Sequence, residues 1–124
     1  MAYTTRETTI FPSAIRAATV ASADQVNEGG HRGVILFIDM TVVPGVDTVT
    51  FTIQGKSALS AEYYTILASA ALVAAGNTVL RVFPLSTVTA NLAANDQLAA
   101  LWRVNAVHSA ATNFTYSVNA ILLP

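Results

Sequence analysis

The segment 46–53 reads VDTVTFTI, and from its third residue threonine alternates strictly with apolar side chains. An extended strand places successive side chains on opposite faces, so this period predicts a strand with one packed face and one wet face. Similar runs recur along most of the chain. We therefore predict an all-β fold.

The segment 33–43 differs because its first half, GVILFI, is apolar at every position after the glycine. The β-branched content favours a strand over a helix, and continuous apolarity predicts a central strand covered on two sides. Pro44-Gly45 then separates it from the alternating segment, which predicts a hairpin. The other predicted strands are 62–68, 78–83, 102–107 and 114–120.

Alanine-rich segments are ambiguous, because alanine is the best helix former yet also occurs in strands. We predict a short strand within 14–23, and strand plus loop rather than helix in 68–75, since Gly76-Asn77 follows at once. Residues 84–96 show no clear period and are predicted to be a long connection. Residues 98–101 are predicted to form a helical turn.

Seven or eight short strands with turns every 8–12 residues predict one domain over residues 1–124. Its fold class is a single-domain antiparallel β-sandwich or jelly roll. Residues 1–12 are polar and threonine-rich, and we predict an extended N-terminal arm or an edge strand there. The predicted core consists of Val34, Leu36, Ile38, Val49, Phe51, Ile53, Ile66, Leu80, Val82, Trp102, Val104, Phe114, Tyr116 and Val118.

The surface is expected to be poor in charge. Of the 124 residues, 53% are hydrophobic and 10% are charged, with a formal net charge of −1. Ordinary soluble domains carry about 25% charged residues. Weak repulsion between copies favours a surface that other protein covers. An alanine- and threonine-rich monomer is the alternative.

Several function classes find no support in the residues. The chain has no cysteine for disulfides or thiolate metal sites, and its six Lys and Arg residues form no basic patch for nucleic acid. No secretory signal is visible, and no apolar run approaches the roughly 18 residues of a membrane helix. Neither a nucleophile elbow nor a phosphate-binding glycine loop is present. We predict no catalytic residue, no cofactor and no bound metal.

Five residues are of types that often carry chemistry or bind sugars: two histidines, one aspartate within an apolar strand and two adjacent tyrosines. His31 and His108 are predicted to be solvated loop residues rather than metal ligands. Asp39 interrupts an apolar strand, so it either faces solvent or pairs with Arg81 or Arg103, since an unpaired buried carboxylate is costly. Tyr63 and Tyr64 are adjacent and fall on opposite faces of a strand, which favours packing over a sugar-binding platform.

Several segments resemble small structural proteins of tailed bacteriophages: 1–6 (MAYTTR), 49–56 (VTFTIQGK), 63–67 (YYTIL), 78–84 (TVLRVFP), 102–104 (WRV) and 114–118 (FTYSV). The resemblance implies a non-enzymatic virion component. The favoured role is a capsid decoration, or cement, protein that binds the outer capsid surface and stabilises capsomer contacts. It further implies synthesis in the host cytoplasm, the major capsid protein or other virion proteins as partners, and a homo-oligomer with the trimer favoured.

The two chain ends are the predicted partner contacts. The arm is expected to add a strand to a neighbour's sheet edge, and the apolar C-terminus packs either in its own subunit or against a partner. Two other functions stay open: a tail, neck or head-fibre-base component, and a carbohydrate-binding module that uses Tyr63 or Tyr64. The candidate contact residues are Tyr3, Thr4, Thr5, Arg6, Ile121, Leu122 and Leu123.

Overall fold

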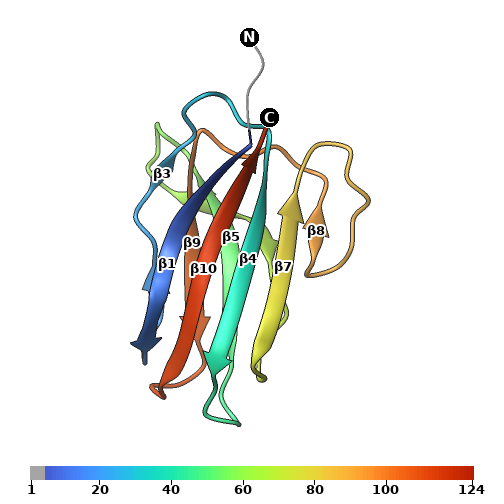
Figure 1. Cartoon of the computed structure of the whole chain (residues 1–124). Coiled ribbons are helices and arrows are strands. Elements are labelled where there is room, and N and C mark those ends of the chain that lie inside the picture. Colours follow the sequence, from blue (N-terminus) through green and yellow to red (C-terminus); the bar gives the residue numbers. More distant parts are fainter. Residues whose placement is uncertain (1–4) are drawn as a thin grey trace.

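The computed structural model describes residues 5–124, and this part of the chain is all-β with no helix (Figure 1). Three of the strands have only two residues and extend the sheets formed by the longer strands. The elements are β1 (Arg6–Arg16), β2 (Val20–Ala21), β3 (Gln25–Val26), β4 (Gly33–Val42), β5 (Val49–Lys56), β6 (Tyr63–Ala68), β7 (Gly76–Val82), β8 (Ala93–Ala94), β9 (Leu101–His108) and β10 (Phe114–Leu123).

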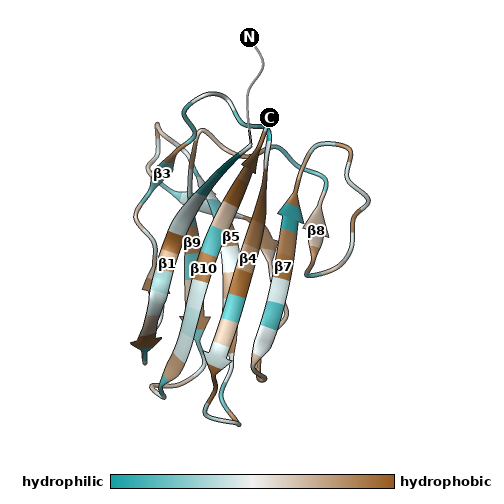
Figure 2. Cartoon of the chain, viewed as in Figure 1, coloured by the Kyte–Doolittle hydropathy of each residue, from teal (hydrophilic) through white to brown (hydrophobic). Residues whose placement is uncertain are grey.

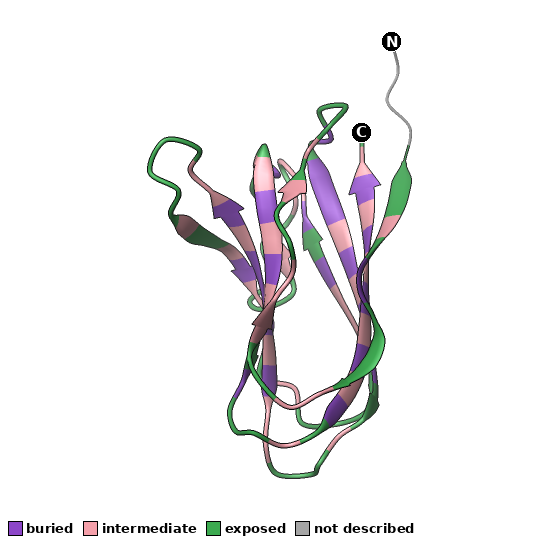
Figure 3. Cartoon of the chain, turned by 90° about the vertical axis from the view of Figure 1, so that its left-hand side faces the viewer, coloured by how far each residue is buried: buried purple, intermediate pink, exposed green. Residues whose placement is uncertain are grey.

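The strands form two sheets. The first has the order β1-β10-β4-β7-β8 and the second has the order β2-β9-β5-β6, with β3 also paired to β9. All pairings are antiparallel except that of β7 with β8. Seen from the side, the two sheets are separate layers (Figure 3). One cluster of buried side chains draws its members from both sheets, so the core lies between them.

Strand pairing is nested from the chain ends inwards. β1 pairs with β10, β2 and β3 with β9, β4 with β7, and β5 with β6. β2 and β3 act as one interrupted strand, because between them the Ser22 amide donates to the Val104 carbonyl at 2.8 Å and the Val104 amide donates to Ser22 Oγ at 2.9 Å. The chain therefore follows the path of one long hairpin folded over on itself.

The centre of the core is aromatic. The Tyr116 ring meets the Phe51 ring edge-on at 5.0 Å between centroids, and the Phe11 ring at 6.1 Å. Edge-to-face packing places the positive ring edge on the negative ring face and adds about 0.5–1.5 kcal/mol beyond area burial. Trp102 is also buried, at 1% exposure.

Period-two alternation predicted the core well, with one error. Every predicted core residue is buried except Ile66, which is partly buried and packs against the cluster, while its neighbour Leu67 occupies the core. The physical reason is a register shift between β5 and β6: Ile53 pairs with Leu67 and Gln54 pairs with Thr65, so Ile66 has no opposite residue. A bulge of this kind inverts the alternation locally.

The ambiguous segments resolve mainly as strand and loop. Residues 14–23 contain the end of β1 and the whole of β2, and β6 ends at Ala68. The connection 84–96 contains β8, which runs parallel to β7. The predicted helical turn at 98–101 is wrong. The Leu98 amide donates to the Arg32 carbonyl at 2.9 Å, and the Ala100 carbonyl accepts from Asn27, which holds the segment extended.

Candidate partner-contact surfaces

The N-terminal contact residues fall partly outside the described chain. Tyr3 and Thr4 precede residue 5, so their placement is not described. Thr5 is exposed, and Arg6 begins β1, where it lies opposite Leu122 of β10. From Arg6 onwards the segment is an edge strand of the chain's own first sheet rather than a free arm.

The C-terminal contact residues belong to β10, which lies between β1 and β4. Leu122 points into the core and is 6% exposed. Ile121 and Leu123 alternate to the other side and are half-buried on the outer face of the first sheet. The sequence predicts that the C-terminal segment packs either within its own subunit or against a partner. Leu122 packs within its own subunit, whereas Ile121 and Leu123 face outwards.

The outer face of the first sheet is apolar at its centre. In β4 the inward side chains are buried, whereas Ile35 and Phe37 point outwards and are half-buried. Register places Ile121 beside Ile35, and places Phe37 between Val79 of β7 and the polar Asn119 of β10. Figure 2 shows apolar colour along the upper halves of β10 and β4. We call this surface the apolar face; it consists of Ile35, Phe37, Val79, Phe83, Ile121 and Leu123.

Gly33 shapes one end of the apolar face. A Cβ atom at this position would collide with the Val82 carbonyl oxygen and with the Phe83 ring. Glycine therefore lets the Phe83 ring approach the backbone of β4 closely. The Arg32 guanidinium lies 5.3 Å from the centroid of the same ring, which places a cation at the rim of the face.

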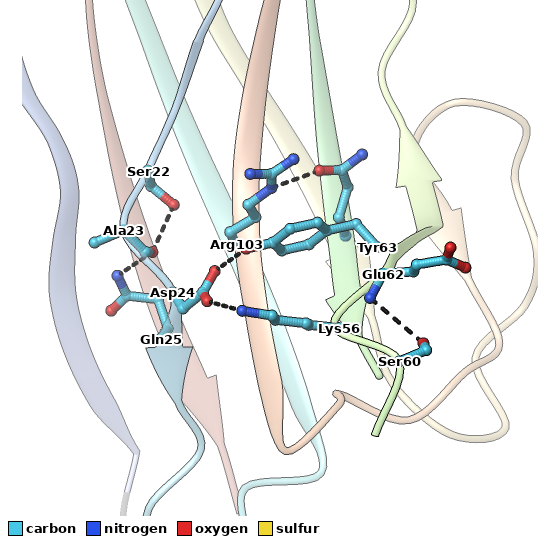
Figure 4. A network of polar contacts seen from close by, with 10 residues as sticks. Ser22, Ala23, Asp24, Gln25, Lys56, Ser60, Glu62, Tyr63 and Arg103 are labelled. Atoms are coloured by element: carbon cyan, nitrogen blue, oxygen red, sulfur yellow. Dashed lines mark hydrogen bonds and ion pairs between the residues drawn. The ribbon is translucent and has the colours of Figure 1, made fainter. Parts of the chain in front are cut away.

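The outer face of the second sheet is polar by comparison. Asp24 Oδ2 lies 2.8 Å from Lys56 Nζ, and the Tyr63 hydroxyl donates to Asp24 Oδ1 at 2.6 Å (Figure 4). Arg103 Nε donates to Gln54 Oε1 at 2.8 Å. Hydrogen bonds from Lys56 and Tyr63 lower the pKa of Asp24, and the bond to Asp24 raises the pKa of Lys56. This network satisfies its own charges within one chain.

The tyrosines of β6 form no shared platform for a sugar ring. The Arg103 guanidinium lies 3.5 Å from the Tyr63 ring centroid and covers one face of that ring. Tyr64 is 50% exposed, but it points to the opposite side of the strand, where its ring lies over Gly55. A Cβ at Gly55 would collide with that ring. The two rings therefore serve packing on different faces.

Asp39 lies on the outer face of the first sheet, between Ser117 of β10 and Asn77 of β7. It is half-buried and outward-facing, and Arg81 and Arg103 are not its partners. Within residues 5–124, the ion pair between Lys56 and Asp24 stands alone. The solvent-facing alternative for Asp39 is therefore the one observed.

The prediction of solvated histidines is wrong for both residues. His31 is 7% exposed and His108 is 9% exposed. The backbone of His31 is fixed by Asn27, whose Nδ2 donates to the His31 carbonyl at 2.7 Å and whose Oδ1 accepts from the His31 amide at 3.0 Å. This pair of bonds closes the loop that follows β3 and turns the imidazole inwards.

His108 belongs to a buried cluster at the end of β9. Its Nε2 and the Tyr116 hydroxyl share a hydrogen bond of 2.9 Å, and the Phe114 ring meets the imidazole edge-on at 5.3 Å. The Arg16 guanidinium lies 4.8 Å from the Tyr116 ring centroid. Burial lowers the pKa of His108, with Arg16 adding to the effect, and burial raises the pKa of Tyr116 to about 12.

Searches of the described residues for small-molecule and membrane features return nothing. Over residues 5–124 there is no pocket and no group of three His, Cys, Asp or Glu side chains placed to hold a metal ion. None of the described segments is a helix with the length and apolarity to cross a bilayer. Comparison with family models, curated proteins and solved structures identifies no match to this chain.

Proposed function

We propose that this protein is a non-enzymatic structural component of a bacteriophage virion, and that it decorates the outer surface of the capsid. The observation that carries the proposal is the nested strand order, with the first strand beside the last in one sheet and the second beside the next-to-last in the other. If β2 and β3 are counted as one strand and the two-residue β8 is left out, eight strands remain. Eight strands in this order make a jelly roll, which is a fold typical of viral capsid domains and lectins. We propose the jelly roll as the finer description of this fold.

The choice of a capsid role over a lectin role rests on the surface. Small-molecule sites are typically concave pockets with a few convergent polar groups. Tyr63 is covered on one face by Arg103, and Tyr64 lies on the other side of β6, so the two rings form no shared platform. Because fold alone does not fix function, we base the choice on these surface features, which favour the capsid role. We propose the major capsid protein or other virion proteins as partners, and no cofactor or nucleic acid.

One end of the molecule is suited to the capsid contact. The connections after β5 and β7 lie at the end where the described chain begins and finishes (Figure 1). These connections carry Leu59 and Leu85, which are 102% and 91% exposed. Burial of such exposed apolar side chains by a partner lowers the free energy of the complex. Contacts from several such loops raise the avidity without a single strong site.

The test is binding to capsids of the encoding phage from which the protein has been removed. We expect the purified chain to co-sediment with these capsids and to raise the temperature at which they rupture. Leu59→Asp/Leu85→Asp should weaken binding at least tenfold. The matched control is Val46→Asp, in the connection between β4 and β5 at the opposite end of the molecule (Figure 1), where the side chain is 85% exposed.

Two outcomes contradict the proposal. Absence of binding to any part of the particle would exclude a virion role. Binding confined to the tail or neck would retain a virion role but exclude capsid decoration.

A further inference from the structure

Strand β4 is apolar on both faces, but this chain covers it on one. Leu36 and Ile38 are fully buried against the second sheet, whereas no strand layer formed by residues 5–124 lies above Ile35 and Phe37 on the opposite face. Strands that read as continuous apolar runs are normally covered on both faces. The sequence of β4 therefore favours a second cover over this face, beyond what residues 5–124 provide.

Charges at the margins of the apolar face indicate what that molecule is. Register places Glu7, Ile121, Ile35 and Arg81 in one row across β1, β10, β4 and β7. Glu7 and Arg81 are exposed and flank the two apolar residues, with Glu7 on the edge strand and β8 continuing the sheet beyond Arg81. Figure 2 shows this arrangement as hydrophilic ends of β1 and β7 on either side of apolar β10 and β4. An acid and a base placed symmetrically about an apolar centre are complementary to a copy of themselves.

We propose that a second copy of this chain packs face to face on the apolar face. The two-fold axis runs parallel to the strands, in the interface, midway between β10 and β4. This axis places Glu7 of each copy opposite Arg81 of the other and brings Ile121 over Ile35. In the next row it brings the Asn119 amide over the Phe37 ring. In the row of Asp39 it places that carboxylate opposite the Ser117 hydroxyl, which can donate to it. Stacked sheets lie about 10 Å apart, a span that Glu and Arg side chains can bridge together.

The area of the face suits a weak dimer. Four strands about 4.8 Å apart and about eight residues long present a surface of roughly 500 Å². Two copies would thus bury about 1,000 Å² in total, which is at the lower limit for a specific interface. We therefore expect a weak dimer whose population rises with protein concentration. This symmetry differs from the trimer that the phage resemblance implies, and the inference does not depend on the virion function.

The experiment is sedimentation equilibrium of the full chain, with charge reversals at the two margins. We expect the wild type to reach the mass of two chains of 13.0 kDa. Glu7→Arg and Arg81→Glu should each weaken association about tenfold, because each reversal brings like charges together at two places in the symmetric pair. The double variant Glu7→Arg/Arg81→Glu restores the attraction and should recover dimerisation to within about twofold of the wild type.

The matched control is Glu62→Arg, a reversal at an exposed acid in the connection between β5 and β6. It makes the same change in net charge as Glu7→Arg, and we expect the dimer to persist. Circular dichroism spectra that coincide for all variants would show that the fold is retained. A wild type that stays monomeric at millimolar concentration, a trimer, or a double variant as weak as the single variants would each overturn the proposal.

Discussion

Tyr116→Phe tests the buried cluster at the end of β9. The substitution keeps the ring and its edge-on contacts with Phe51, but it removes the hydroxyl that bonds His108 Nε2 at 2.9 Å. Tyr116 has no exposed surface, so water does not replace the lost partner. Leaving a buried polar group without its partner costs about 1–3 kcal/mol. We expect the free energy of unfolding to fall by that amount.

The assay is urea denaturation at pH 8, followed by the fluorescence of Trp102, which is the one tryptophan in the chain. The matched control is Tyr64→Phe, where the side chain is 50% exposed and the effect should stay within about 0.5 kcal/mol. The double variant His108→Leu/Tyr116→Phe removes both polar groups and should cost less than the sum of its single variants. A Tyr116→Phe variant as stable as the wild type would refute the reasoning.

Two further predictions concern pH and backbone clearance. Folding lowers the pKa of His108, so the folded state binds fewer protons than the unfolded state. The free energy of unfolding should therefore fall as the pH drops below about 6.5, and His108→Gln should flatten this dependence. Because the pKa of Tyr116 rises from 10.0 to about 12, stability should also fall as the pH rises through that interval; a flat profile in both ranges would contradict the assignment. Gly33→Ala should lower the free energy of unfolding by about 1–3 kcal/mol, because the added methyl group would collide with the Val82 carbonyl oxygen. The measurement is thermal denaturation, and a variant as stable as the wild type would show that this close approach does not require glycine.

The sequence could predict which side chains point into the core, because this depends on the alternation of apolar and polar residues within each strand. Alternation in 46–53 and 114–120 placed Phe51, Tyr116 and Val118 in the core, where they lie. The same rule failed at Ile66, since a bulge depends on the partner strand and leaves no mark in the segment itself. Local pattern thus predicts the core until pairing irregularities intervene.

The surfaces depend on pairing between distant residues, which alternation does not reveal. Arg6 lies opposite Leu122, and Glu7 shares a row with Arg81, although these residues are far apart in the sequence. His108 appeared to belong to a loop, but its amide donates to Thr19 Oγ1 at 3.0 Å and its position in β9 turns the imidazole towards Tyr116. The polar network around Asp24 likewise requires β5, β6 and the connection between β2 and β3 to meet.

Imaging of the intact particle by electron cryomicroscopy tests the virion role most directly. We predict density for this two-sheet unit on the outside of the capsid, with the loops that carry Leu59 and Leu85 against at least two capsid subunits. Particles that lack such density, or that carry it in the tail alone, would contradict a role in capsid decoration.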